Sequence, residues 1–227
     1  MENTTLTINV NASSFDWFEK YLWSLIDVFV ANEAKLNELD SITNRGDFGT
    51  KICSSFQSTS PNIKVYRSYG PRIALFELST FFLNSFNDNF GKIISEWALK
   101  LMELIEELPN FELKTLAPAI TEATNHIKKT FKLDVKDKSF FTIWEPVQDV
   151  LNKNVDLPPD RLYKLMLETA EKALIQSKQM RSRYGRSNYL GKRSIGLIDP
   201  TAYAMYLAIK VLVDETNNES NSNNRDE

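Results

Sequence analysis

Apolar side chains recur at helical spacing along almost the whole chain, and this periodicity is the strongest constraint on its fold. Between residues 13 and 40 the periodic positions share one helix face: Phe18, Leu22, Leu25, Ile26, Phe29 and Val30. Comparable runs predict further helices over residues 50–57, 71–87, 90–108, 116–131, 139–152, 159–181 and 199–213. Pro146, inside the run 139–152, is expected to bend or break that helix locally. No stretch reads as a convincing strand, so the sequence predicts an all-α protein with eight helices in an antiparallel bundle or barrel.

The two ends of the chain differ from this helical part. Residues 1–12 alternate polar and apolar only weakly and are expected to be a loose segment. Residues 214–227 are rich in Asn, Ser and Glu, cannot bury a core, and are predicted to form a disordered polar tail. We therefore expect one helical domain over residues 13–213.

Composition excludes several classes of function. The single cysteine, Cys53, allows neither an internal disulfide nor a cysteine zinc site, and it fits a reducing, cytoplasmic compartment. The single histidine, His126, lies in a helical run, which argues against histidine metal sites and catalytic triads. A net charge of −3 without a basic run argues against nucleic acid binding, and no apolar run reaches the roughly 18 residues of a membrane span.

The segment 36–51, LNELDSITNRGDFGTK, has the composition of an ion or phosphate site between two helices. Asp40 and Asp47 offer hard oxygen ligands for Mg²⁺, and Gly46 and Gly49 let backbone N–H groups approach a phosphate. An ordinary helix end followed by an Asn/Gly turn explains the same residues. Five of the seven glycines lie in two loops, 46–49 and 185–196, which suggests a site at one end of the bundle or simple helix stops.

Three segments resemble one known family. Residues 185–200, GRSNYLGKRSIGLIDP, closely resemble G-R-A-S-Y-L-G-E-R-S-x-G-x-x-D-P-G-A of the nucleotide-binding, DhaL-type subunits of dihydroxyacetone kinases. Residues 136–147, KDKSFFTIWEPV, resemble G-D-K-T-M-x-D-x-W-x-P, and residues 39–50 resemble L-D-x-x-I-G-D-G-D-H-G. The segments follow the family's order and spacing over about residues 15–213. The resemblance implies an eight-helix antiparallel barrel with ADP or ATP at one mouth and two Mg²⁺ ions held by three aspartates.

The resemblance also implies roles for individual residues. Asp40 and Asp47 match the first and third metal aspartates, whereas Arg45 stands in place of the middle one, so one Mg²⁺ ion or none is expected. The positions matched to nucleotide binding are Phe48, Gly49, Thr50, Lys51, Ala74, Asp137, Arg186, Asp199, Pro200 and Thr201.

The departures from the family pattern fall in the metal and phosphate loops. Arg45 removes a metal ligand and adds a positive charge, and Phe48 replaces a histidine. The glycine- and serine-rich phosphate loop corresponds to residues 70–76, GPRIALF, where Ala74 takes the serine position, and Thr201 replaces a late glycine. Because phosphoryl transfer depends on positioning and charge neutralisation, these losses predict little or no transfer activity.

Three functions follow from this pattern. The first is a catalytically impaired DhaL-type subunit that acts as a regulatory or partner-binding paralogue with DhaK-like or DhaM-like proteins. The second is an active kinase subunit that binds ADP or ATP and transfers a phosphoryl group to dihydroxyacetone on a DhaK partner, or to another hydroxy or acyl substrate. In this alternative Arg45 replaces one Mg²⁺ ion. The third is a helical interaction domain without ligand, in which residues 185–200 are structural: Arg186 pairs with an acid and Asp199 caps a helix.

Overall fold

The computed structural model describes residues 12–63, 66, 70–106, 108 and 113–223. These residues form eight α-helices and three short 3₁₀ segments, without a strand in the described part. The α-helices are α1 (Ala12–Ser41), α2 (Phe48–Gln57), α4 (Pro71–Ser85), α5 (Asn89–Leu104), α6 (Leu113–Phe131), α7 (Phe140–Asn154), α8 (Pro159–Ser177) and α9 (Pro200–Asn223). The 3₁₀ segments are η1 (Ser60–Asn62), η2 (Val135–Asp137) and η3 (Arg186–Ser194). The predicted all-α class is confirmed.

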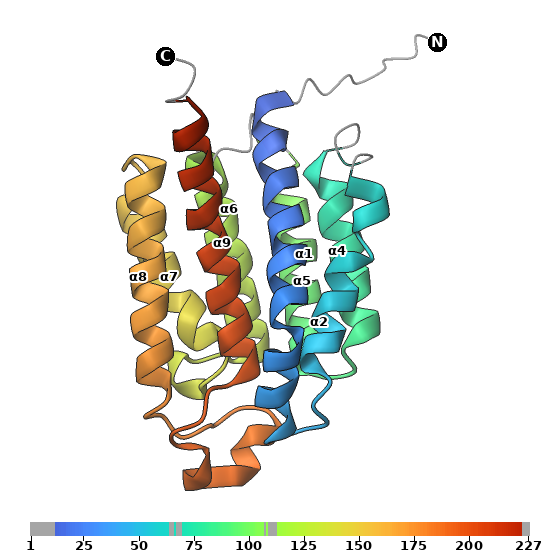
Figure 1. Cartoon of the computed structure of the whole chain (residues 1–227), viewed down its shortest axis with the longest axis vertical. Helices are drawn as coiled ribbons and strands as arrows, with labels where there is room; N and C mark the ends of the chain where they lie inside the picture. The colour runs from blue at the N-terminus through green and yellow to red at the C-terminus, as the bar shows by residue number, and fades with distance from the viewer. Residues whose placement is uncertain (1–11, 64–65, 67–69, 107, 109–112, 224–227) are drawn as a thin grey trace.

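The helices stand side by side and alternate in direction around a ring (Figure 1). Each α-helix packs against the next along the chain, and the last helix, α9, packs against the first, α1. The Tyr21 hydroxyl on α1 donates a hydrogen bond to the Ala208 carbonyl on α9 at 3.1 Å, which joins the two ends of the ring. The predicted antiparallel eight-helix barrel is therefore confirmed.

Apolar side chains from the ring of helices point inward and form the core. The largest fully buried ones include Phe29, Phe86, Phe141, Ile93 and Leu151, from three helices and one loop. They leave an almost entirely apolar cavity of about 290 Å³ inside the barrel. None of the described helices is long and apolar enough to span a membrane.

Side-chain caps begin three helices at the same end of the barrel. Asp88 Oδ1 accepts N–H bonds from Phe90 at 3.0 Å and Gly91 at 3.3 Å at the start of α5. Ser139 and Thr142 form a reciprocal capping box at the start of α7. Asp199 caps α9 as Asp88 caps α5, because its Oδ1 accepts N–H bonds from Thr201 and Ala202. These residues fix where the chain leaves each loop and enters the barrel wall.

Several predicted boundaries differ from the structure. Helix α8 ends at Ser177 instead of continuing to residue 181, and α7 runs through Pro146 without the expected break. Helix α9 continues to Asn223, beyond the predicted helix end at residue 213. A helix already nucleated by packing can extend at little cost, because each added residue gains one backbone hydrogen bond. The predicted loose segment 1–12 lies, except for Ala12, outside the described residues.

Candidate functional site

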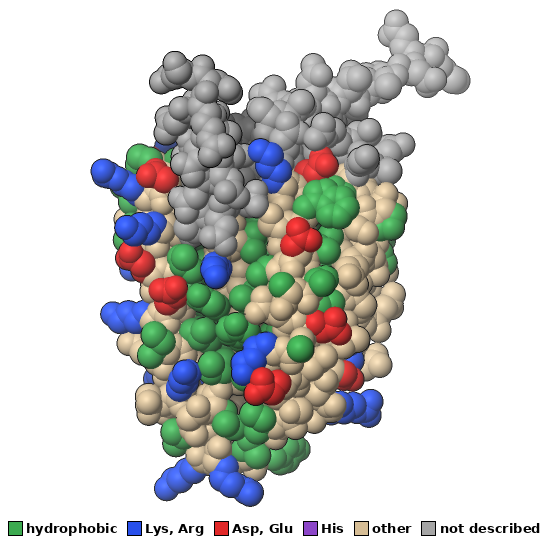
Figure 2. All heavy atoms as spheres, viewed as in Figure 1, with side chains coloured by type: hydrophobic (Ala, Val, Ile, Leu, Met, Phe, Trp, Pro, Cys, Tyr) green, Lys and Arg blue, Asp and Glu red, His purple; other side chains and the backbone are tan. Residues whose placement is uncertain are grey.

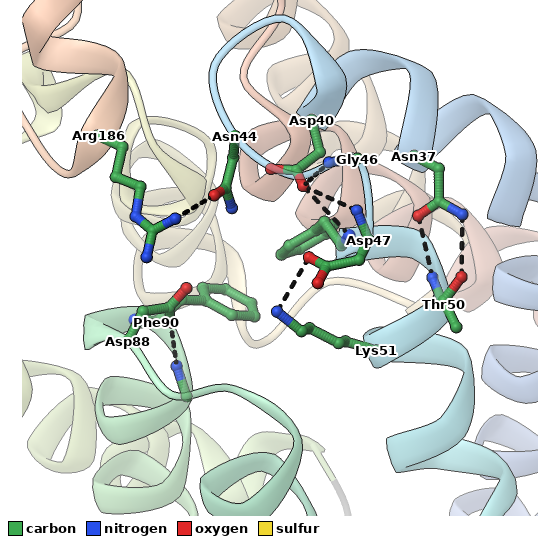
Figure 3. Close-up of polar contacts among 12 residues, drawn as sticks. Asn37, Asp40, Asn44, Gly46, Asp47, Thr50, Lys51, Asp88, Phe90 and Arg186 are labelled. Atoms are coloured by element: carbon green, nitrogen blue, oxygen red, sulfur yellow. Dashed lines mark hydrogen bonds and ion pairs between the residues drawn. The ribbon is translucent and has the colours of Figure 1, made fainter.

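Four loops meet at one end of the barrel, opposite to the end where the chain termini lie (Figure 1). They connect α1 to α2, α4 to α5, α6 to α7, and α8 to α9. The two glycine-rich loops of the sequence are in contact there, because Arg186 of η3 donates a hydrogen bond to the side-chain oxygen of Asn44 (Figure 3). We call this end the mouth; it gathers all but one of the residues that the sequence resemblance singles out.

Asp40 is buried and organises the α1–α2 loop from within. Its Oδ2 atom accepts backbone N–H bonds from Gly46 at 3.0 Å, Asp47 at 3.1 Å and Phe48 at 3.3 Å (Figure 3). Gly46 permits this tight turn because its φ is +74°, in the left-handed region. Helix α2 begins at Phe48, earlier than the predicted Thr50, since Asp40 accepts the Phe48 N–H and Asn37 accepts the Thr50 N–H. Asp40 therefore acts as a cap for the loop and for α2.

Asp47 is paired with a lysine one turn further along α2. Lys51 Nζ lies 2.9 Å from Asp47 Oδ1, and both side chains are about one third exposed, at 29% and 35% respectively. Among the described residues Asp47 Oδ1 accepts no hydrogen bond, so its contact with Lys51 is an ion pair. Arg45, the residue expected to replace a metal ion, is exposed and forms no ion pair or hydrogen bond with the part of the chain that the structure describes. The cation beside Asp47 is thus Lys51.

Gly49 and Thr50 hold α2 against α1. A Cβ atom on Gly49 would lie 2.2 Å from the Glu33 carbonyl oxygen, so the helices could not approach as they do with any larger residue. Thr50 N–H donates to Asn37 Oδ1 at 3.1 Å, and the Thr50 hydroxyl donates to Glu33 Oε1 at 2.7 Å. The Thr50 N–H, which the resemblance would offer to a phosphate, is occupied within the protein.

Phe48 contributes to an aromatic cluster below the mouth. Its ring centroid lies 5.4 Å from that of Phe86 and 5.3 Å from that of Phe90, and its side chain is buried. These edge-tilted contacts stabilise the packing of α2 against the start of α5. A phenylalanine in place of the family's histidine therefore extends the apolar core to the base of the α1–α2 loop.

The α6–α7 loop holds the α8–α9 loop in place through two residues. The Asp137 carbonyl accepts the Arg183 N–H of the α8–α9 loop at 3.3 Å. The Asp137 side chain stays within its own loop, where Oδ2 accepts the Asp134 N–H at 2.8 Å, and burial raises the pKa of this carboxyl. Lys138 is buried with φ at +59°, and its ammonium donates to the carbonyls of Met180, at 3.1 Å, and Ser194. Burial lowers the pKa of Lys138, whereas Asp199 nearby raises it. Lys138 thus bridges the two ends of the loop that carries η3.

Asp199, Pro200 and Thr201 form the start of α9. Asp199 Oδ1 accepts from the Thr201 N–H at 2.9 Å and from the Thr201 hydroxyl at 2.5 Å. The same hydroxyl accepts the Phe140 N–H at 2.9 Å, so it connects α9 to α7, and Pro200 is buried beside it. Burial raises the pKa of the Asp199 carboxyl, while these hydrogen bonds lower it. Threonine in place of the family's glycine adds a structural link between two helices.

Ala74 is the one predicted site residue that the structure does not bring to the mouth. It is fully buried in a cluster with Leu22 and Ile26, in the first half of α1. Asp40 lies 18 residues beyond Leu22 on the same helix, which corresponds to roughly 27 Å at 1.5 Å per residue. Sequence reasoning missed other residues at the mouth, namely Asn37, Asn44 and Asp88, because an isolated Asn or Asp also signals an ordinary cap or turn.

The α8–α9 loop gives the mouth a basic rim. Its exposed cationic residues are Arg181, Arg183, Arg186, Lys192 and Arg193. Figure 2 shows Lys and Arg side chains, without Asp or Glu, at the tip of the molecule where η3 lies. The chain as a whole carries a net charge of −3, so this is a local concentration of positive charge that favours an anionic ligand.

The acidic residues at the mouth do not fit a divalent metal ion as they stand. Among the described residues, no group of three or more His, Cys, Asp or Glu side chains is placed to hold one. One oxygen of Asp40 already accepts three N–H bonds, and Asp47 is neutralised by Lys51. Mg²⁺ requires near-octahedral oxygen coordination, which this donor set does not supply.

Comparisons with known proteins agree with the resemblance seen in the sequence. Residues 45–214 match the DAK2 domain family. The chain is 23% identical over 207 residues to the ADP-binding subunit DhaL of PEP-dependent dihydroxyacetone kinase 1 from Listeria innocua, covering 87% of this chain and 95% of that protein. It is 22% identical over 190 residues to the ADP-binding subunit DhaL of the Escherichia coli enzyme, covering 82% of this chain and 90% of that protein.

Solved structures share the fold. The dihydroxyacetone kinase of C. freundii superimposes with a TM-score of 0.68 at 14% identity, over 95% of this chain and 37% of that one. Its complex with AMP-PNP and Mg²⁺ gives a TM-score of 0.66 at 15% identity. This chain therefore spans a little over one third of the length of the solved kinase.

Proposed function

The chain belongs to the DAK2 domain family, and on this premise we propose that it is the nucleotide-binding, DhaL-type subunit of a dihydroxyacetone kinase system. In this proposal it works in the cytoplasm with a DhaK-like or DhaM-like partner and binds ADP or ATP at the mouth. It transfers phosphoryl groups weakly or not at all and acts mainly as a regulatory or partner-binding paralogue.

The contact between Arg186 and Asn44 is the observation that carries nucleotide binding. It brings the best-preserved segment of the sequence, residues 185–200, against the α1–α2 loop over the mouth. Arg186 is exposed and this hydrogen bond is to a neutral amide, so its guanidinium can turn to a phosphate at little cost. The basic rim adds further attraction for a nucleotide.

The contacts within the α1–α2 loop support the proposal that catalysis is weak. A phosphoryl-transfer site of this family needs Mg²⁺ ligands and free backbone donors for the phosphates, and Mg²⁺ would supply charge neutralisation when bound. In this chain the N–H groups of Gly46, Asp47 and Phe48 are bound to Asp40, and Thr50 N–H is bound to Asn37. A nucleotide would have to displace these internal contacts before its phosphates could reach the loop.

Calorimetric titration with ADP tests the binding step. We expect saturable binding, and we expect Arg186→Ala to weaken it about tenfold, the loss of one charge-assisted hydrogen bond. Arg161→Ala is the matched control, since Arg161 is an exposed arginine near the start of α8, at the end away from the mouth. Absence of ADP binding would favour the alternative of a helical interaction domain without ligand.

A reconstituted kinase assay tests the catalytic step. The purified chain replaces the DhaL subunit in a system that contains the DhaK and DhaM proteins of a relative, and dihydroxyacetone phosphate is measured. We expect turnover at least a hundredfold below that of the relative's own DhaL. Turnover at an ordinary kinase rate would support the alternative, an active subunit, and would refute the impaired one.

A further inference from the structure

Resting on the proposed function, we infer that Lys51 supplies, as a built-in cation, the positive charge that divalent ions give to nucleotide phosphates in related sites. The chain would then bind nucleotide without a metal ion. This inference is motivated by the acidic residues at the mouth, which do not supply the oxygen ligands that Mg²⁺ requires.

Lys51 is held at the mouth by two contacts. Its Nζ lies 2.9 Å from Asp47 Oδ1 and 6.0 Å from the centroid of the Phe86 ring. With 29% of its side chain exposed, it is neither fully buried nor free in solvent. An ammonium carries three donors, and among the described residues Lys51 Nζ forms no hydrogen bond beyond its ion pair with Asp47. Its donors therefore remain available to a phosphate oxygen.

The other charged groups at the mouth argue against a divalent ion beside Lys51. Asp88, which faces the same space in Figure 3, accepts the Phe90 and Gly91 N–H groups. Asp40 is committed to the loop backbone, and Arg45 adds a positive charge where the family has a carboxylate. A metal ion at Asp47 would lie within a few ångströms of the Lys51 ammonium, and two like charges at that distance repel.

Titration with ADP in EDTA and in Mg²⁺ distinguishes the lysine from a metal. For the wild-type chain we expect dissociation constants within about threefold of each other in the two buffers. Lys51→Met should weaken binding in EDTA at least tenfold, whereas Lys51→Arg, which keeps the charge, should retain it. Lys100→Met is the matched control, since Lys100 is also a paired helical lysine, with 26% of its side chain exposed, far from the mouth.

Asp47→Asn gives opposite results under the two mechanisms. If Lys51 provides the charge, removing its carboxylate partner frees it, and ADP binding in EDTA should stay the same or strengthen. If Asp47 binds a metal ion, the same substitution should abolish binding in Mg²⁺. A requirement for Mg²⁺ in the wild type, or loss of binding in Asp47→Asn, would overturn the inference.

Two further probes separate this inference from the proposed function. Electron paramagnetic resonance of Mn²⁺ with the chain alone should show no stoichiometric binding, and submillimolar binding that Asp47→Asn removes would contradict the inference. Inorganic pyrophosphate in EDTA replaces ADP as the second probe. If the chain does not bind ADP but binds pyrophosphate in a manner that depends on Lys51, the nucleotide function is refuted and the lysine site is retained. Failure of both ligands would refute both.

Discussion

Replacing Asp40 by alanine tests whether this residue is a structural cap or a metal ligand. The Asp40 side chain is only 3% exposed, and one of its oxygens accepts three backbone N–H bonds. A hydrogen bond to a charged group contributes about 1.5–3 kcal/mol, and three bonds to one oxygen share its capacity. We therefore expect Asp40→Ala to lower the free energy of unfolding by about 4 kcal/mol.

The effect is large enough for standard unfolding measurements. For a domain of this size, 1 kcal/mol corresponds to about 2–4 °C in melting temperature, so Asp40→Ala should melt roughly 8–16 °C below the wild type. Urea unfolding followed by tryptophan fluorescence and circular dichroism gives the free energy directly. Asp40→Asn keeps an acceptor oxygen but loses the charge, and should lose about 1–2 kcal/mol.

Asp47→Ala is the control, because Asp47 belongs to the same loop and its main partner is the partly exposed Lys51. We expect this variant to change the free energy of unfolding by at most about 1 kcal/mol. A metal-ligand role predicts unchanged or higher stability for Asp40→Ala, because removing one of two neighbouring acids from an empty metal site relieves repulsion. If Asp40→Ala is as stable as the wild type, or more stable, the cap assignment is wrong.

Three further predictions follow from the contacts around the mouth. Gly49→Ala should lose at least about 2 kcal/mol in thermal denaturation, because the new Cβ would meet the Glu33 carbonyl oxygen 2.2 Å away. Burial raises the pKa of Asp199, so the folded protein binds the proton of this carboxyl more tightly than the unfolded chain does. The melting temperature of the wild type relative to that of Asp199→Asn should therefore fall as pH rises from about 4 to 7, when both proteins are melted at each pH. Lys138→Met removes the bonds to the Met180 and Ser194 carbonyls, and hydrogen exchange should accelerate across residues 178–196 while α1 stays protected.

Much of the fold was accessible from the sequence. The runs that predicted helices correspond to the eight described α-helices, because one apolar stripe per helix must face the barrel interior. The end of α9 was not predicted, since composition alone does not reveal that a packed helix can extend into a polar segment. The passage of α7 through Pro146 was also missed, since packing on both sides of α7 stabilises the helix against the loss of one N–H donor.

Only part of the candidate site could be predicted from the sequence. The segments around Asp40, Asp137 and Arg186 do meet at one end, as the two glycine-rich loops suggested. Sequence matching could not show that Asp40 binds backbone N–H groups or that Lys51 pairs with Asp47, because both depend on the path of the loop. Ala74 was matched by neighbouring letters alone, and its position in the core near Leu22 shows how weak such a match is when the surrounding glycines are missing.

The contact between the first and last helices has a consequence for how the protein is made. Tyr21 on α1 reaches Ala208 on α9 across 187 residues of sequence, so a ribosome must synthesise nearly the whole chain before α1 can meet its second neighbour. Until then the inward face of α1, with Leu25 and Phe29, has only one of its two flanking helices available. Contacts of such long sequence separation form slowly, and the nascent chain carries an open apolar seam for most of its synthesis. Any product truncated before α9 would retain that seam permanently, as a surface prone to association and proteolysis.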